Sequence, residues 1–498
     1  MNVNPITRLD YPDLDVIRVE DTYYMVSTTM HFMPGCEILQ SFDLVHWEHV
    51  TYVYETLDHT DAQQLKSGQN IYGQGMWAAS LRYHEGRFYI CFVANDTRKT
   101  YLYTSEKIDG PWKKQLIEGF YHDGSLLFDE DGRNYIVYGN DEIWITELNE
   151  DLTAPKKDGL HRLLVSDHKN PELGYEGSHI QKINGYYYIF LIHSLRDRWM
   201  RTEACFYSDS LEGEFTGGDV LCDDRGYCGQ GVAQGGIVDT PDGKWYAMLF
   251  QDSGAVGRIP ILLPVTWKDH FPIFGQNGHV PEEIEVHSTR PGYIYQPLVG
   301  SDDFCNGLLP RWQFNHDPDP RYYHLDALQG TYTITTREVC TELTQAVNTL
   351  TQRMSYPSCA AEVTVDASAL KEGDVAGLCA LQGCYAAVGI TKHHGKYEVL
   401  MLDKKEDGIL DMTEGTVVES HQMDFRLEAD FCNMKDEARC YYRVNKGDWL
   451  PIGTVHKLYF KLDHFTGCRF GLFCYAAEET GGSACFRDFK YYDVDEIS

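Results

Sequence analysis

Three acidic residues of this chain stand at matching distances from a repeated tyrosine. The tyrosine recurs in five similar segments of the first 270 residues, at Tyr24, Tyr89, Tyr135, Tyr188 and Tyr246. Counting back 12 residues from the last four gives Trp77, Asp123, Glu176 and Gln234, and counting back 11 from the first gives Asp13. Equivalent positions of repeated units meet when the units surround one axis. The spacing therefore predicts a ring of two aspartates, one glutamate, one glutamine and one tryptophan.

A ring with three carboxyl groups favours acid–base chemistry. The three groups repel one another and lose hydration, which raises the pKa of at least one of them. Hydrolysis of a glycoside needs one protonated carboxyl group at the leaving oxygen and one ionised carboxylate opposite it. A third carboxylate keeps the acid protonated, and a tryptophan suits stacking on a sugar face. A calcium site and a purely structural cluster are the alternatives, although the chain has no DxDxDG loop.

Five repeated elements must position such a ring. The segments read PDLDVIRVEDTYYMVST, WAASLRYHEGRFYICFV, DGSLLFDEDGRNYIVYG, EGSHIQKINGYYYIFLI and QGGIVDTPDGKWYAMLF. Each contains a β-run, a polar turn and an aromatic-rich β-run, which is a hairpin signal. Repeats of about 40–60 residues with three or four strands are typical of propeller blades. We therefore expect a five-bladed β-propeller over residues 1–270, with an ordinary β-sandwich as the alternative.

Composition excludes several classes of function. The 498 residues include 43 Lys and Arg against 75 Asp and Glu, a net charge of −32. Phosphates repel such a chain, so we expect neither a nucleic-acid nor a membrane partner. The 15 cysteines show no CxxC pair or zinc spacing, and no apolar run suggests a signal peptide or a membrane helix. We expect a cytoplasmic protein with reduced thiols, and the sequence leaves the oligomeric state open, a homo-oligomer included.

The motifs around the three carboxylates resemble those of glycoside hydrolase family 43. YPDLDVIRVEDTYYMVSTT is similar to the family's opening motif, whose aspartate is the general base, and this implies that role for Asp13. HDGSLLFDEDGRNYIVYG resembles the second motif and implies that Asp123 orients the acid and raises its pKa. YEGSHIQKINGYYYIF resembles the motif of the general acid, here Glu176. The chain departs from the family pattern at Leu14, Asp15 and Ser178.

The resemblance also implies residues that contact the sugar. HFMPGCEILQSFDLVHW is similar to the family's FPG segment, which makes His31 and Phe32 candidates for the sugar pocket. MWAASLRY resembles the WAP segment and retains Trp77, and AVGRIPILLPVTW implies that Arg258 reaches sugar hydroxyls. Many relatives hold calcium through an HQG motif, but this chain reads VAQGGIVDT, which leaves Gln234 to bind substrate or a central water. We expect no required cofactor, with a structural calcium as the alternative.

The second half of the chain predicts another all-β domain. Residues 271–300 carry Pro and Gly without strong periodicity and are interpreted as a linker. From residue 301 to 498 the propeller spacing is lost, and runs such as GTYTITT and CRFGLFCYA predict a β-sandwich of jelly-roll type. This stretch resembles the concanavalin-like domain of family 43 β-xylosidases, in which it narrows the active-site mouth. The aromatic-rich segment 312–323 could line that mouth or the domain interface.

Together these observations predict an inverting glycoside hydrolase. The resemblance implies that its substrate is a β-1,4-xylo-oligosaccharide, from which terminal xylose is released. An α-L-arabinofuranosidase, or an enzyme with both activities, is the alternative, because the two sugars present similar hydroxyls to one pocket. A sugar-binding propeller without catalysis is a further alternative, against which the retained acid and base argue.

Overall fold

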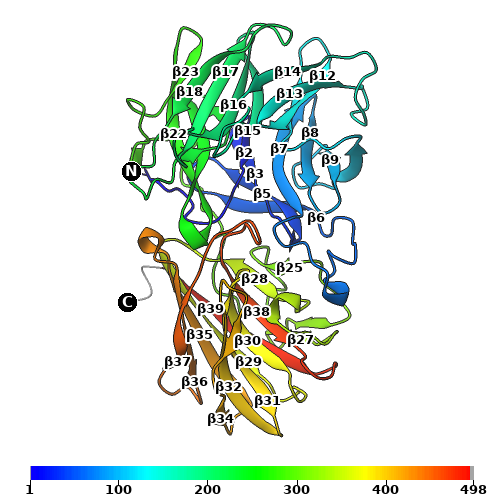
Figure 1. Cartoon of the computed structure of the whole chain (residues 1–498), viewed down its shortest axis with the longest axis vertical. Coiled ribbons are helices and arrows are strands. Elements are labelled where there is room, and N and C mark those ends of the chain that lie inside the picture. The colour runs from blue at the N-terminus through cyan, green and yellow to red at the C-terminus, as the bar shows by residue number, and fades with distance from the viewer. Residues whose placement is uncertain (1, 494–498) are drawn as a thin grey trace.

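Strands dominate residues 2–493, the part of the chain that the computed structural model describes. They form two stacked domains, an N-terminal set of radiating sheets and a C-terminal pair of layered sheets (Figure 1). The helical elements within these residues are single 3₁₀ turns: η1 (Lys66–Gly68), η2 (Gly254–Val256), η3 (Leu343–Gln345) and η4 (Cys432–Met434). Across residues 2–493 we find no helix long and apolar enough to cross a membrane.

The N-terminal domain is a five-bladed β-propeller, as predicted. Blade 1 contains β2 (Asp15–Val19), β3 (Thr22–Val26), β5 (Gly35–Ser41) and β6 (Glu48–Tyr54). Blade 2 contains β7 (Met76–His84), β8 (Arg87–Ala94), β9 (Lys99–Ser105) and β10 (Lys113–Ile117). Blade 3 contains β11 (Ser125–Phe128), β12 (Asn134–Asn140), β13 (Glu142–Leu148) and β14 (His161–Ser166).

Blades 4 and 5 complete the propeller. Blade 4 contains β15 (Glu176–Ile183), β16 (Tyr186–Ser194), β17 (Arg201–Ser208) and β18 (Thr216–Leu221). Blade 5 contains β19 (Val232–Ala233), β20 (Ile237–Asp239), β21 (Trp245–Asp252), β22 (Arg258–Lys268) and β23 (Phe271–Phe274). Strand β20 contacts β2 of blade 1, which closes the circle.

The hairpin turns explain why the repeats fold into blades. Blade 4 turns through Asn184–Gly185 and blade 2 through Glu85–Gly86, two-residue loops in which both residues have positive φ. Such turns match the right-handed twist of the strands that they join. Each recurring tyrosine lies on the strand that follows the turn, in β3, β8, β12, β16 and β21. The innermost strand therefore always precedes the tyrosine, so its first residues lie at one mouth of the channel.

The C-terminal domain is a concanavalin-like β-sandwich, also as predicted. One sheet contains β28 (Leu350–Arg353), β30 (Val375–Leu381), β31 (Ala386–His393), β32 (Lys396–Lys404), β33 (Leu410–Met412), β34 (Thr416–Val418), β38 (Arg469–Tyr475) and β25 (Gln313–Asn315). The other contains β26 (Tyr323–Asp326), β27 (Thr331–Thr335), β29 (Ser358–Asp366), β35 (Gln422–Asp430), β36 (Glu437–Arg443), β37 (Leu450–Lys457) and β39 (Ser483–Asp493). Their facing apolar residues form one core.

The two domains share structural elements. The propeller strand β4 (Phe32–Met33) pairs with β25 and so becomes the last strand of a sandwich sheet. Turn η2 packs its Ala255 and Val256 into the core of the sandwich. At the N-terminal edge, β1 (Asn2–Val3) pairs with β24 (Glu283–Ile284) of the segment that links the domains.

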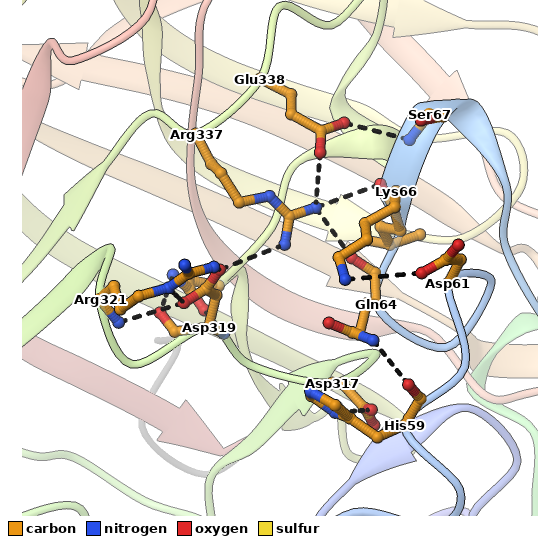
Figure 2. A network of polar contacts seen from close by, with 12 residues as sticks. His59, Asp61, Gln64, Lys66, Ser67, Asp317, Asp319, Arg321, Arg337 and Glu338 are labelled. Carbon is orange, nitrogen blue, oxygen red and sulfur yellow. Dashed lines mark hydrogen bonds and ion pairs between the residues drawn. The ribbon is translucent and has the colours of Figure 1, made fainter.

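A polar network fastens the loop between blades 1 and 2 to the sandwich (Figure 2). Arg337 donates to the backbone carbonyl of Gln64 at 2.9 Å, and the N–H of Ser67 donates to Glu338 at 3.2 Å. Earlier in the loop, His59 pairs with the buried Asp317 at 2.7 Å. The loop that leads into the innermost strand of blade 2 is thus held by the second domain.

Candidate active site

The predicted ring positions meet around the propeller axis. A cavity of about 10 Å³ at this point is lined by residues of all five blades, among them Asp13, Ala78, Asp123, Gly177 and Gln234. These five residues all have positive φ, of 51°, 37°, 48°, 66° and 62° respectively. A non-glycine residue rarely adopts this conformation, and such strain gathers at functional sites. The repeat therefore includes one left-handed residue per blade, where the chain enters the innermost strand.

Trp77 and Glu176 lie one residue before the left-handed position, whereas Asp13, Asp123 and Gln234 occupy it. The difference comes from bulges, because the pairing register shifts after Trp77 in β7 and after Glu176 in β15. The side chain of Glu176 is consequently 22% exposed, against 8% for Asp13 and 7% for Asp123. The counted ring is thus split into two levels, with Glu176 and Trp77 closer to solvent.

Asp13 has a partner on each carboxylate oxygen. The Arg258 guanidinium donates from Nη1 to Oδ1 at 2.9 Å, and the Thr28 hydroxyl donates to Oδ2 at 2.7 Å. Thr28 also accepts the N–H of Ala78 at 2.8 Å, which ties the aspartate to blade 2. These two hydrogen bonds fix the orientation of the carboxyl group, and the one from the guanidinium is charge-assisted. The arrangement suits a carboxylate that accepts a proton from water.

Asp123 and His122 form the electrostatic centre of the site. Burial raises the pKa of Asp123, His122 opposes this rise, and Glu176 and Asp13 add to it, so that the pKa reaches about 6. Burial alone would lower the pKa of His122, but the charges of Asp123, Glu176 and Asp13 raise it to about 9. The N–H of Gly177 donates to Asp123 at 3.0 Å and links blade 3 to blade 4.

Glu176 is held through only one of its two oxygens. Asn140 donates to Oε2 at 2.8 Å, and Nε2 of His122 lies 3.4 Å from the same oxygen. Oε1 has no such donor among the contacts that hold Glu176, so it is the oxygen available to carry a proton. The half-exposed position of the residue lets that proton reach a bound molecule.

One wall of the mouth comes from the sandwich. The loop between β37 and β38 places Phe465 with its ring centroid 5.4 Å from that of Trp77 and 4.3 Å from the guanidinium carbon of Arg258. Two nitrogens of Arg258, Nε and Nη2, are buried without a hydrogen-bond partner. Donors left in this way are available to the hydroxyls of a bound sugar. Sequence reasoning placed Trp77 and Arg258 here but missed Phe465.

His31 and Phe32 are not brought to the ring. Phe32 belongs to β4, packs into the sandwich and lies under the Arg469 guanidinium at 3.5 Å. His31 is fully buried between the domains, with ring centroids 4.8 Å from His316 and 5.0 Å from His464. The strand pairing with β25 explains this position, because it turns the segment toward the second domain. Contact of these two residues with sugar stays a prediction.

The axis does not fit a calcium ion. Ala233 stands where the HQG motif has its histidine, and the backbone N–H of the next residue, Gln234, donates to the fully buried Glu203 at 2.7 Å. Burial raises the pKa of the Glu203 carboxyl group well above its usual range, although the hydrogen bond from Gln234 opposes this rise. In residues 2–493 one set of three His, Cys, Asp or Glu side chains has ligand atoms all within 4.8 Å of one another, and it comprises His122, Asp123 and Glu176. Calcium requires six to eight oxygen ligands, more than the side chains of this one group offer.

Three further residues of the site escaped sequence reasoning. His122 directly precedes Asp123, so a titratable neighbour of a ring carboxylate was a signal present in the sequence. Asn140 ends the strand that contains the recurring Tyr135, and Thr28 follows the strand that contains Tyr24. Further residues of the site therefore lie at, or just after, the strand ends that face the ring.

Comparisons with known proteins agree with this architecture. A family model described as glycosyl hydrolases family 43 matches residues 3–272, and one described as the beta-xylosidase C-terminal concanavalin A-like domain matches residues 301–492. A beta-xylosidase from Formosa agariphila is 27% identical, over 99% of this chain and 89% of the relative.

Solved structures share the whole two-domain arrangement. A structure described as a bifunctional GH43-CE from Bacteroides eggerthii has a TM-score of 0.93 and 42% identity over 100% of this chain. This chain spans 64% of that protein's chain. A GH43 glycoside hydrolase engineered to display both endo-xylanase and exo-arabinofuranosidase activity has a TM-score of 0.86 and 27% identity, over 99% of each chain.

Proposed function

The chain belongs to glycosyl hydrolase family 43, and from this premise we propose that it releases terminal xylose from β-1,4-xylo-oligosaccharides with inversion. One observation supports this most directly. Three carboxyl groups from three blades surround one mouth in three different environments: Asp13 fully hydrogen-bonded, Asp123 buried, and Glu176 half-exposed. Such separation of environments is what assigns acid and base roles to chemically similar groups.

In the proposed reaction, Asp13 is the general base. Its ionised carboxylate, held by Arg258 and Thr28, accepts a proton from the water that attacks the anomeric carbon. Because the two hydrogen bonds fix both oxygens, the carboxylate is oriented before the substrate arrives. Arg258 additionally offers its two unpartnered nitrogens to the sugar.

Glu176 is the proposed general acid. It gives a proton from Oε1 to the leaving oxygen while Asn140 and His122 hold Oε2. Asp123 contributes through its charge, since a neighbouring carboxylate favours retention of a proton within the cluster. The reaction then forms the bond between the anomeric carbon and the water oxygen as the glycosidic bond breaks in one displacement.

The shape of the mouth supports action on chain ends. Phe465 of the sandwich packs against both Trp77 and Arg258 of the propeller, so the two domains narrow the entrance together. Aromatic faces suit stacking against a sugar ring, and a closed wall leaves little room for a polymer that continues in both directions. The relative named a beta-xylosidase supports xylose as the terminal sugar.

An α-L-arabinofuranosidase, or an enzyme with both activities, is the second candidate. The structural relative engineered for endo-xylanase and exo-arabinofuranosidase activity favours this possibility, because its fold covers 99% of this chain. Parallel kinetics on aryl xyloside and aryl arabinofuranoside would rank the two activities. A sugar-binding protein without catalysis would bind both compounds and cleave neither.

A proton NMR time course with xylobiose tests the proposal. Early α-xylose from the β-linked substrate is the expected result, and it supports both the substrate and inversion. Early β-xylose would overturn the roles of Asp13 and Glu176. On an aryl xyloside with a good leaving group, Glu176→Ala should keep more activity than Asp13→Ala, because only the acid's contribution depends on leaving-group basicity.

We also propose that the reaction needs no metal. The base, the acid and the charged neighbour are all protein side chains, and the axis donors do not fit calcium. Incubation with EDTA followed by dialysis should leave kcat/KM and the thermal unfolding midpoint unchanged. A loss of activity that calcium alone restores would refute this.

A further inference from the structure

Asp10 joins both domains at a point three residues before Asp13. It is 6% exposed, and each of its carboxylate oxygens accepts one backbone N–H. Oδ1 accepts from Arg258 at 2.7 Å, and Oδ2 accepts from Gly467 of the sandwich at 2.8 Å. In both bonds the acceptor is a side-chain oxygen and not the backbone of a neighbouring strand. The two bonds therefore depend on which residue occupies position 10.

The first of these N–H donors is that of Arg258, the first residue of β22, whose side chain orients the catalytic base Asp13. Arg258 follows turn η2, whose Ala255 accepts the N–H of Cys468 at 2.8 Å and donates to Asp436 at 3.1 Å. The turn is therefore held by the sandwich on one side, while Asp10 holds the backbone of Arg258, two residues after the turn, on the other. Because Arg258 donates to Asp13, its backbone position sets the geometry at the base.

The second donor belongs to the loop that supplies Phe465. Gly467 packs so closely that a Cβ placed there would lie 2.7 Å from the Cβ of Asp10 and 2.2 Å from the carbonyl oxygen of Val256. Phe465, two residues earlier, covers the Arg258 guanidinium. A shift of this loop would therefore move the aromatic wall of the mouth.

We propose that Asp10 is a positioning residue, whose carboxylate holds the backbone of Arg258 and the backbone of Gly467 together and thereby fixes the base and the aromatic wall in one geometry. The proposal rests on the catalytic roles given above. It explains why a carboxylate is present, since two separate N–H donors need two acceptor oxygens. An amide would turn one acceptor into a donor that faces another N–H.

Asp10→Asn tests this with little change in volume. We expect kcat/KM on the substrate that the wild type cleaves to fall roughly 100-fold, mostly through kcat, because misplacement by about 1 Å has effects of this size. Asp302→Asn is the matched control. Asp302 is also a buried carboxylate with two N–H donors, from Phe304 and Trp312, but it lies inside the sandwich. It should lower stability without lowering kcat of the folded enzyme.

A double-mutant cycle with Phe465→Ala separates positioning from general destabilisation. If Asp10 acts through the aromatic wall, its substitution should change kcat/KM clearly less in the Phe465→Ala background than in the wild type. Fully multiplicative losses, wild-type kinetics of Asp10→Asn, or equal losses in Asp302→Asn would each overturn the proposal.

Hydrogen exchange gives a readout that does not depend on the reaction. In Asp10→Asn, peptides that cover residues 254–258 and 459–468 should exchange faster, while the rest of the sandwich keeps its protection. Unchanged exchange in both peptides would contradict the proposal. If the wild type cleaves no glycoside, the catalytic roles fail, and the exchange result still decides whether Asp10 holds the two segments.

Discussion

Glu176 presents a single free carboxyl oxygen, and this asymmetry decides what the residue can do. Asn140 and His122 both contact Oε2. With both neighbours on one oxygen, the proton is confined to Oε1, on the side that faces away from Asn140. A general acid needs this order, because a proton on the wrong oxygen must wait for rotation of the carboxyl group.

Asn140→Ala should therefore lower kcat by about 10- to 100-fold with little change in KM. Asn140 is exposed, so the unfolding midpoint should stay near that of the wild type. The loss should shrink on an aryl xyloside with a good leaving group, since protonation then contributes less to the barrier. Steady-state kinetics on good and poor leaving groups measure this. An equal loss on both would show that Asn140 does not act through the acid.

At the scale of elements, the bulges in β7 and β15 separate the acid from the base. They move Trp77 and Glu176 one residue outward from the left-handed position and leave Ala78 and Gly177 there. Glu176 thus gains exposure without leaving the ring. The inner level holds the buried Asp13 and Asp123, where desolvation and like charges act most strongly.

Gly177→Ala should disturb the inner level of the site, which holds Asp13 and Asp123. At a φ of 66° an alanine costs about 1–2 kcal/mol, and its Cβ would lie 2.7 Å from the side chain of Gln234. The N–H of Gly177 also donates to Asp123, so we expect kcat to fall together with stability. Ala78→Gly is the control at the equivalent position of blade 2. It should raise stability by up to about 1 kcal/mol and keep kcat. Urea unfolding and kinetics of both variants check the pair.

Much of the inner level of the site was predictable from the sequence. The positions that the sequence did not predict correctly have identifiable physical causes. A distance of 11 or 12 residues to the recurring tyrosine identified Asp13, Asp123 and Gln234, because hairpins of similar length repeat their geometry. The same count placed Trp77 and Glu176 level with these three residues, whereas in the structure each lies one residue before the left-handed position, closer to solvent. Bulges depend on how a strand packs against its neighbouring blade, and the residue pattern of the strand alone does not record that packing.

The aromatic wall lay beyond sequence reasoning for a different reason. Phe465 lies in an irregular loop of another domain, and no repeat or spacing connects it to the ring. His31 and Phe32 show the converse, since a motif placed them at the sugar pocket while pairing with β25 draws them into the interface. Contacts between domains are set by tertiary packing, which overrides local pattern.

At the scale of the whole molecule, a buried ion pair binds the two domains beside the site. Arg353 of the sandwich lies 2.9 Å from Glu37 of blade 1 and donates to the backbone of Asp10 at 2.9 Å. Its guanidinium also covers the ring of Tyr11 at 4.1 Å. Burial would raise the pKa of Glu37, but Arg353 and His49 lower it from 4.5 to about 2. The ionised form is thus favoured in the folded protein.

Arg353→Met should lower the free energy of unfolding at pH 7 by about 3–5 kcal/mol, because it leaves the Glu37 carboxylate buried without its cation. Since the pKa of Glu37 is lowered on folding, the stability it contributes is present above about pH 4.5 and is lost as the pH falls through about 2. The difference in free energy of unfolding between the wild type and the variant should therefore narrow toward pH 2.

Calorimetry across this pH range measures that difference. We also expect the variant to unfold in two transitions where the wild type shows one. The double variant Glu37→Gln, Arg353→Met should recover part of the loss, because no unpaired charge remains. A single transition at constant difference from the wild type would show that this pair does not couple the domains.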